Sequence, residues 1–312
     1  MDKSAHNRAW PYAALFVSIL CIAWSAIFVR WTSVPGPTSA FYRLLIPAIV
    51  LLPTWLLPGT RKKLSPRSYA IIAIGGFFFA LDLAFYNTSI LQTSAANATL
   101  LGNNTPIFVG VLTWLVFRRR PSGAFWIGLA LAIAGSLLIL AADISRYAKF
   151  GLGDAMALSA SACFAVYLLA TEQVRAHTGT LEFLRLAILS STIFMFVFTL
   201  ILHVPLGIPD HRSLLALLGL GLISQLGGYL ALTYALGHLP ATVTSVSLLS
   251  QGPLTAALAA LFLGEPLTRY QIAGGALVLI GVGLANHFGK PEEEVNAAFG
   301  QAADAEAVGR AD

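Results

Sequence analysis

Residues 11–30 read PYAALFVSILCIAWSAIFVR, a run of twenty residues whose one charged side chain is the arginine at its end. About 20 apolar residues in a helix are enough to cross the hydrocarbon core of a bilayer. The run is too long for a cleavable signal peptide, and no small-residue cleavage site follows Arg30–Trp31. It therefore predicts a membrane-spanning helix that the protein retains.

Nine further apolar runs follow the first, which gives ten predicted spans at residues 11–30, 37–58, 68–90, 93–117, 122–142, 151–172, 181–204, 212–236, 241–263 and 268–288. Of the 312 residues 57% are apolar and 11% are charged, whereas a soluble domain carries about 25% charged residues. This composition excludes an ordinary soluble enzyme and a disordered chain. Because open sheet edges in lipid leave backbone groups unsatisfied, the spans are predicted to be helices, which makes the chain an all-α polytopic membrane protein.

The basic residues lie in short runs between the apolar blocks, as in membrane proteins, so no nucleic-acid partner is predicted. With a cytoplasmic N-terminus, twelve Lys and Arg fall on the inner side and five on the outer side. The sequence thus predicts a multi-pass protein in contact with the lipid of a bacterial inner membrane, with both termini cytoplasmic. The acidic and Ala/Gly-rich residues 290–312 are predicted to form a disordered tail.

The two halves of the chain resemble each other. Phe41-Tyr42-Arg43-Leu44 opens the second predicted span, and Phe183-Leu184-Arg185-Leu186 opens the seventh, 142 positions later. The same offset pairs Cys21 with Cys163, two residues that we interpret as small buried hydrophobes. Chance matching between apolar helices of similar composition is the alternative explanation.

Later spans keep this correspondence after small loop adjustments. At an offset of 147 Pro106 matches Pro253, and at 146 Gly128 and Gly135 match Gly274 and Gly281. Because each repeat holds five spans, an odd number, the second repeat must enter the membrane inverted. We therefore predict ten transmembrane helices arranged as two inverted five-helix repeats, residues 1–146 and 147–289, around a central cavity.

The sequence resembles the drug/metabolite transporter superfamily, and in particular its ten-helix EamA-type exporters. The resemblance covers residues 11–288 and is carried by Trp24-Ser25, Arg43, Pro106, Pro253 and Gly264-Glu265-Pro266-Leu267-Thr268 before a Gly-rich last span. It implies five-plus-five inverted repeats around a cavity, with the fifth and tenth helices at the periphery. It also implies export of amino acids, metabolites or related amphiphiles. The family's usual Glu at the end of the fourth span is Arg118 here, so a role for that acid does not carry over to the first half.

Asp82 is the carboxylate that lies deepest in a predicted span, and Tyr86 follows it one helical turn later. An ionisable group at the centre of a span costs about 2.5–3.5 kcal/mol on insertion scales, so such groups are functional by default. Asp82 is therefore predicted to anchor a substrate ammonium or to carry a proton. The alternative is a structural partner for Arg43 or for a backbone donor.

The fourth and ninth spans carry matching polar side chains, Asn97 and Asn104 in the former and Gln251 in the latter. Pro106 and Pro253 each free a carbonyl one turn earlier and can kink the helix, which suits a gate. The polar side chains either line the substrate pathway or bond across packed helices.

The remaining candidates are aromatic or charged. Gln225 and Tyr229 lie one turn apart in the eighth span, while Trp24 and Tyr167 occupy comparable places in the first and sixth. These rings either stack on a substrate or sandwich an ammonium, or they only pack. Arg43 and Arg185 form a charge clasp for a substrate carboxylate, or they pair with lipid phosphates and helix ends.

Motifs for other chemistry are missing from the sequence. It contains no GxxxxGK[ST], HExxH or CxxC, and its six histidines have no metal-ligand spacing, so no ATP hydrolysis, metal site or cofactor is predicted. An intramembrane enzyme would need a nucleophile–base pair or facing acids, and a channel is hard to reconcile with a two-gated repeat.

The function predicted is that of a secondary transporter, and not of an enzyme. Its partner is a small amphiphilic substrate, most readily an aromatic or similar amino acid, driven by the substrate's own gradient or by a coupled proton. Export is implied by the resemblance. An importer or exchanger of other metabolites is the alternative, and a homo-oligomer is left open.

Overall fold

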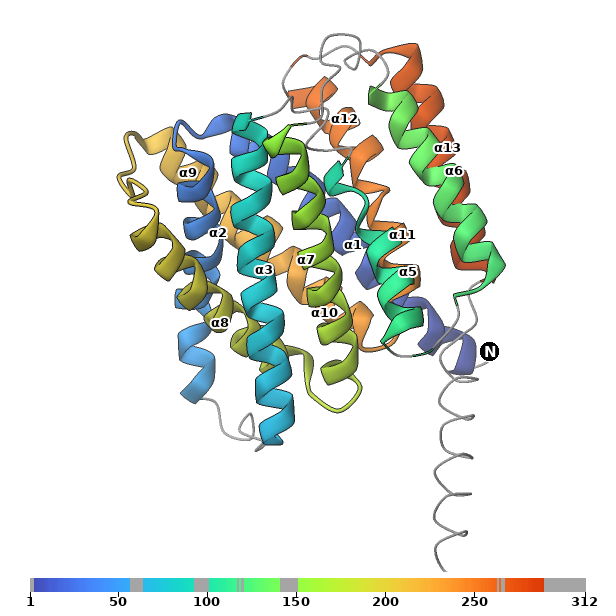
Figure 1. The fold of residues 1–312 in the computed structure, drawn as a ribbon, viewed down its shortest axis with the longest axis horizontal. Coiled ribbons are helices and arrows are strands. Elements are labelled where there is room, and N and C mark those ends of the chain that lie inside the picture. Colours follow the sequence, from blue (N-terminus) through green and yellow to red (C-terminus); the bar gives the residue numbers. More distant parts are fainter. Residues whose placement is uncertain are drawn as a thin grey trace, which may run out of the picture.

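A computed structural model describes residues 3–56, 64–92, 101–116, 118, 121–140, 151–262, 264 and 267–288. Within these residues every regular element is a helix (Figure 1). The elements are α1 (Lys3–Trp31), α2 (Gly36–Leu51), η1 (Leu52–Leu56), α3 (Pro66–Gln92), α5 (Thr105–Leu115), α6 (Gly123–Leu140), α7 (Leu152–Arg175), α8 (Thr180–Ile201), α9 (His211–Gly219), η3 (Leu220–Gly227), α10 (Gly228–Leu236), α11 (Ala241–Leu248), α12 (Gln251–Phe262) and α13 (Arg269–Phe288).

Among the described residues, seven helical stretches are long and apolar enough to cross a membrane: Ala9–Trp31, Gly36–Trp55, Pro66–Ser89, Leu152–Arg175, Thr180–Ile201, His211–Leu236 and Ala241–Phe262. Thr105–Leu115 and Gly123–Leu138 are shorter apolar helices. Together with α13, these helices occupy the ten predicted spans. They confirm the all-α polytopic fold, while the predicted tail at residues 290–312 lies outside the described residues.

The outer faces of the helices are apolar. The side chains of Phe16, Leu215 and Ile272 are 65%, 68% and 62% exposed, which in water would leave large apolar surface uncovered. The interior, by contrast, buries many serine and threonine side chains. This distribution fits a protein whose surrounding solvent is lipid.

The helices α6 and α13 pack against each other as an antiparallel pair at one edge of the molecule (Figure 1). A Cβ atom built on Gly128 would lie 2.5 Å from the carbonyl oxygen of Gly281, and one built on Gly135 would lie 2.5 Å from that of Gly274. Exchanging the repeats, Gly128 with Gly274 and Gly135 with Gly281, turns one contact into the other. The repeats are therefore related by a two-fold axis across antiparallel helices, as inversion requires.

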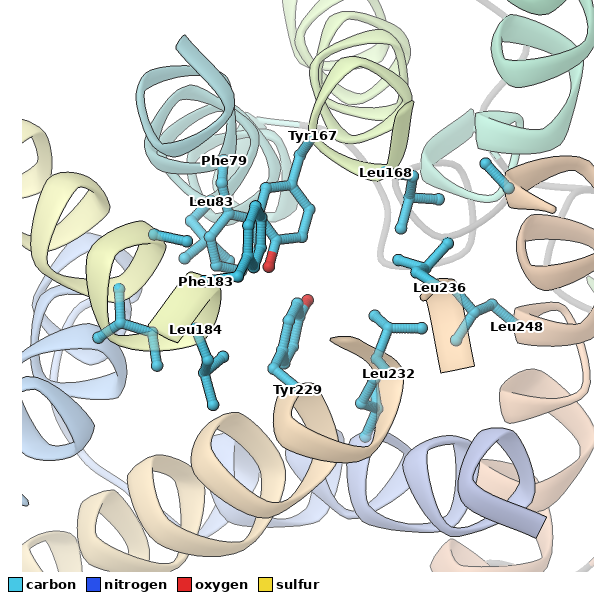
Figure 2. Packing of buried hydrophobic residues seen from close by; sticks show 14 of the residues in the cluster. Phe79, Leu83, Tyr167, Leu168, Phe183, Leu184, Tyr229, Leu232, Leu236 and Leu248 are labelled. Carbon is cyan, nitrogen blue, oxygen red and sulfur yellow. The ribbon is translucent and has the colours of Figure 1, made fainter. Parts of the chain in front are cut away.

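The other helix pairings obey the same exchange. The first span, α1, packs against η3 and α10 of the eighth, and the sixth span, α7, packs against α3, the third. The second span, α2, packs against its own counterpart α8. Between these pairs lies the main core, in which Phe79, Tyr167 and Tyr229 approach one another (Figure 2). The fold confirms two inverted repeats, and the boundaries 1–146 and 147–289 stay a prediction.

Candidate functional site

A cavity of about 270 Å³ lies between helices of both repeats, close to the lower end of the size range of small-ligand sites. Helices α1, α2, α3, α6, α7, α10, α11 and α12 contribute to its wall, together with the start of α5. Its polar lining consists of Ser25, Arg43, Asp82, Tyr86, Asn103, Thr105, Ser136, Tyr229, Gln251 and Thr255. Five predicted site residues, Arg43, Asp82, Tyr86, Tyr229 and Gln251, are thus brought together in one wall.

The cavity holds one group of each charge. Asp82 on α3 and Arg43 on α2 both line it, and each is half-buried. They do not form an ion pair with each other, and within the described part of the chain the Asp82 carboxylate has no hydrogen-bond or salt-bridge partner. Charges away from bulk water are stable only when they are paired, so this cavity is suited to a solute that carries complementary charges.

Gln225 lies behind Arg43 and is fully buried. The Arg43 Nε donates a hydrogen bond of 2.7 Å to Gln225 Oε1, and the guanidinium carbon lies 5.8 Å from the centre of the Tyr229 ring. The Gln225 amide nitrogen has no partner among the described residues, and an unmatched buried donor costs about 1–3 kcal/mol. Gln225 belongs to η3, which is a π-helix, a rare conformation that is often found at functional sites.

The two predicted gate prolines mark helix starts. A turn at Asn103–Asn104 precedes α5, and a turn at Leu249–Ser250 precedes α12. Pro106 and Pro253 lie in the first turn of the new helix, where the missing N–H of proline costs nothing. The spans are broken where the sequence predicted a kink, and the two breaks correspond at an offset of 146. Both half-helices begin at the cavity wall.

The polar stripe of the fourth span is displaced by one residue from its predicted position. Asn103 lines the cavity, whereas Asn104 donates a hydrogen bond of 3.1 Å to the carbonyl of Leu101 just before α5. Asn97 lies outside the described residues.

Two of the predicted aromatic residues lie behind the wall. The Trp24 ring lies 4.7 Å from that of Phe262 and packs beside Phe28 and Trp31, whereas its neighbour Ser25 lines the cavity. Tyr167 is 2% exposed. For Trp24 the structure supports a packing role.

We refer to Phe79, Phe164, Tyr167 and Tyr229 as the aromatic cluster, of which Figure 2 labels Phe79, Tyr167 and Tyr229. Tyr167 stacks on Phe79 with ring centres 4.5 Å apart, and Tyr229 lies 5.0 Å from Phe79. Phe79 lies at the middle of α3, nearer the start of that helix than Asp82 and Tyr86, and Tyr167 lies in the second half of the antiparallel α7. The cluster therefore fills the interior on the side of the cavity that is nearer the start of α3.

Arg185 has a different setting from its repeat counterpart Arg43. It is 4% exposed, its Nη1 donates to the carbonyl of Thr54 at 3.4 Å, and its guanidinium lies 4.7 Å from the Trp55 ring. Glu182 lies 4.0 Å away on the same helix. Arg185 is not part of the cavity wall and joins α8 to η1, so the helix-end alternative describes it better than the clasp.

Two further charged residues with a structural role, Glu172 and Arg175, were not identified from the sequence. We call them the α7 latch. Glu172 Oε2 accepts the N–H of Ala241 at 3.1 Å, and Arg175 Nε donates to the carbonyl of Thr233 at 3.0 Å. The guanidinium also packs on Gly237 so closely that a Cβ there would collide with it. The latch holds the end of α7 to the second half of α10 and to the start of α11, on the side of the aromatic cluster. Its only sequence signal was charge at the end of a predicted span.

Comparisons with known proteins agree with this architecture. The model of the EamA-like transporter family matches residues 9–141 and 151–286. The uncharacterized transporter YwfM of Bacillus subtilis is 27% identical over 284 residues, covering 86% of this chain and 92% of YwfM. The threonine/homoserine exporter RhtA of Salmonella typhimurium is 30% identical over 249 residues, covering 76% of this chain and 77% of RhtA. One solved structure, at 19% identity, has a TM-score of 0.75 over 89% of this chain and 97% of its own, which shows the shared fold.

Proposed function

The chain belongs to the EamA-like transporter family, and from that premise we propose that it exports small amphiphilic metabolites, above all amino acids, by alternating access. Rocking one repeat against the other around a central site is the mechanism that inverted repeats make possible. Substrate class and direction are the parts of this proposal that go beyond the family itself.

One observation carries the choice of substrate: Arg43 and Asp82 line the same cavity without pairing with each other. A zwitterionic amino acid offers an ammonium to the carboxylate and a carboxylate to the guanidinium, and charge-assisted hydrogen bonds of this kind are about twice as strong as neutral ones. The relatives named as threonine/homoserine exporters support the same class. The rings of Tyr86 and Tyr229 would then face the rest of the solute.

Asp82 also accounts for coupling in this proposal. A carboxylate in a membrane interior is tolerated when it is neutralised by a proton or by a bound cation. Either a proton or the substrate ammonium would neutralise Asp82 before the repeats rock. Transport is then driven by the substrate gradient alone or by the substrate gradient with a proton.

The orientation of the protein in the membrane is also part of what we propose. We place the protein in a bacterial inner membrane with both termini in the cytoplasm, supported by twelve basic residues against five. The end of α1 and the end of α3 then lie at the outer face. The cavity residues Ser25 and Tyr86 then lie nearer that face than the aromatic cluster does, and the α7 latch lies toward the cytoplasm.

The test is flux from proteoliposomes loaded with radiolabelled threonine, homoserine or phenylalanine, with and without a pH gradient. Wild type is expected to release the amino acid, and Asp82→Asn is expected to lose gradient-driven release while retaining exchange. Asp210→Asn is a matched control, because Asp210 lies outside the spans and asparagine also caps helices.

Each part of the proposal has its own contrary result. Absence of amino-acid release from wild-type vesicles rejects the substrate class. Exchange without net release identifies an exchanger. An unaltered response of Asp82→Asn to the pH gradient removes Asp82 from coupling.

A further inference from the structure

We infer that Gln225 is a positioning residue for substrate recognition: it fixes the Arg43 guanidinium so that its two terminal nitrogens are presented to the carboxylate of the solute. The inference rests on the proposed function, because it assigns a carboxylate-bearing substrate to the same cavity. It adds a residue that lies behind the cavity wall and is not itself a wall residue.

The first step is the geometry of Arg43. A guanidinium is planar and carries five N–H donors in a fixed fork. The bond of 2.7 Å from Nε to Gln225 Oε1 fixes the plane at one edge, and the Tyr229 ring lies 5.8 Å from the guanidinium carbon. Among the described residues Arg43 makes no other hydrogen bond. The terminal nitrogens therefore remain for a carboxylate, which can accept two parallel bonds from them.

The second step is the choice of an amide at position 225. A glutamate there would also accept from Nε, but it would neutralise the charge that the substrate carboxylate needs. Glutamine orients the guanidinium and leaves it cationic. Gln225 is 0% exposed, and its amide nitrogen lacks a partner within the described residues. If packing alone decided the residue at this buried position, an apolar side chain would be favoured.

The third step is the backbone that carries Gln225. It lies in the π-helical segment η3, packed between α1 and α2. Four residues later Tyr229 faces the same guanidinium. Gln225 near the end of η3 and Tyr229 at the start of α10 thus place two side chains against one arginine. The repeat counterpart Arg185 is bound by the Thr54 carbonyl and the Trp55 ring instead. Among the described residues the cavity wall holds this fork from the first repeat, so the solute would keep one orientation through the cycle.

The test compares an amino acid with its amide in reconstituted protein. Gln225→Met removes the acceptor at similar volume, and it is expected to raise KM for threonine about tenfold, as loss of one hydrogen bond to a charged group would. The maximal rate and the KM for threoninamide, which lacks the carboxylate, are expected to change far less. Gln225→Glu is expected to raise KM for threonine further. Gln173→Met, an exposed position on α7, is the matched control.

A double variant shows whether Gln225 acts through Arg43. Arg43→Lys combined with Gln225→Met is expected to cost little more than Arg43→Lys alone, because residues that act through one contact are not additive. Equal losses for threonine and threoninamide, or additive effects in the double variant, would overturn the inference.

A second readout separates this inference from the proposed function. If wild type moves no amino acid, the proposed function fails, and the unfolding temperature of purified protein is then measured with acetate and propionate and with their amides. Carboxylates that stabilise wild type but not Gln225→Met support the positioning role. Equal responses to carboxylates and amides reject it.

Discussion

The two sides of the interior are built from equivalent positions and yet differ. At the offset of 142, Ser25 of α1 corresponds to Tyr167 of α7. Ser25 lines the cavity, whereas Tyr167 is 2% exposed and stacks on Phe79. A small hydroxyl thus borders the cavity on the side of Ser25, which we call the open side. A ring fills the interior on the side of Tyr167, which we call the closed side. The difference teaches that side chains, together with the irregular segments η1 and η3, make the repeats unequal, although their helix pairings obey one two-fold relation.

At the seam between α6 and α13 the two repeats contribute equivalent glycines to the contact. We expect substitutions of these glycines to have the largest effect on folding. Gly281→Val places a Cβ against the Gly128 carbonyl and the Ala132 N–H, both backbone atoms that cannot rotate away. Overpacking of this kind costs about 1–3 kcal/mol or more, so we expect severe loss of folded protein in size-exclusion profiles. Gly283→Val, on the same helix with nothing within 4 Å of its Cβ, is the control. Similar yields for the two variants would show that the seam is not tightly packed.

The next largest effect should come from making the closed side resemble the open side. Tyr167→Ser removes the ring that stacks on Phe79 and should destabilise the protein by about 3 kcal/mol, as large-to-small core substitutions do. The measurement is the unfolding temperature in detergent. Tyr270→Ser, at a 55% exposed position, serves as the control.

The reciprocal change, Ser25→Tyr, should instead fill the cavity and reduce flux, with a smaller effect on the unfolding temperature. Should Tyr167→Ser prove as stable as Tyr270→Ser, the ring would not be what holds the closed side.

The smallest expected effect lies at the opposite end, where α9 begins. Asp210 accepts the backbone N–H of Ser213 at 2.7 Å and also its hydroxyl, and the backbone bond is the main reason that the pKa of Asp210 lies below its usual value. Because the folded pKa is lowered, the stabilisation is present above the unfolded pKa and is lost as pH falls through the folded pKa. We expect a small acid-dependent decrease in unfolding temperature that Asp210→Ala abolishes. An unchanged pH profile in Asp210→Ala would assign the decrease to other groups.

The sequence predicted the architecture well because lipid imposes simple constraints. Span length and hydropathy follow from the thickness of the bilayer, and an odd number of spans per repeat dictates inversion. Membership of a transporter family confirms the prediction that the chain is a transporter and not an enzyme. A described helix lies in each of the ten predicted spans, and among the described residues the fourth and ninth are broken at the turns that precede Pro106 and Pro253.

The site was harder to predict at the level of single residues. A helix turns by about 100° per residue, so an undetected break or a π-helical turn redirects every later side chain. Asn103, in the turn before α5, lines the cavity where Asn104 was predicted. In the continuous helix α1 Ser25 lines it beside Trp24, because a helix that is apolar all round does not reveal which face meets the cavity. The separate roles of Arg43 and Arg185 depend on η1 and η3, two irregular segments that hydrophobic periodicity does not reveal.

The α7 latch has a consequence for how this protein tolerates sequence change. Glu172 and Arg175 bind main-chain groups of Ala241 and Thr233, not their side chains. Replacing the side chain of Thr233 or Ala241 leaves those carbonyl and amide groups in place, so the fastening does not depend on the identity of these two residues. Gly237 differs, since the guanidinium occupies the space of any added side chain. In a saturation-mutagenesis map, Gly237 and the buried Leu236 and Leu239 would stand out as intolerant, whereas the exposed His238 between them would be permissive.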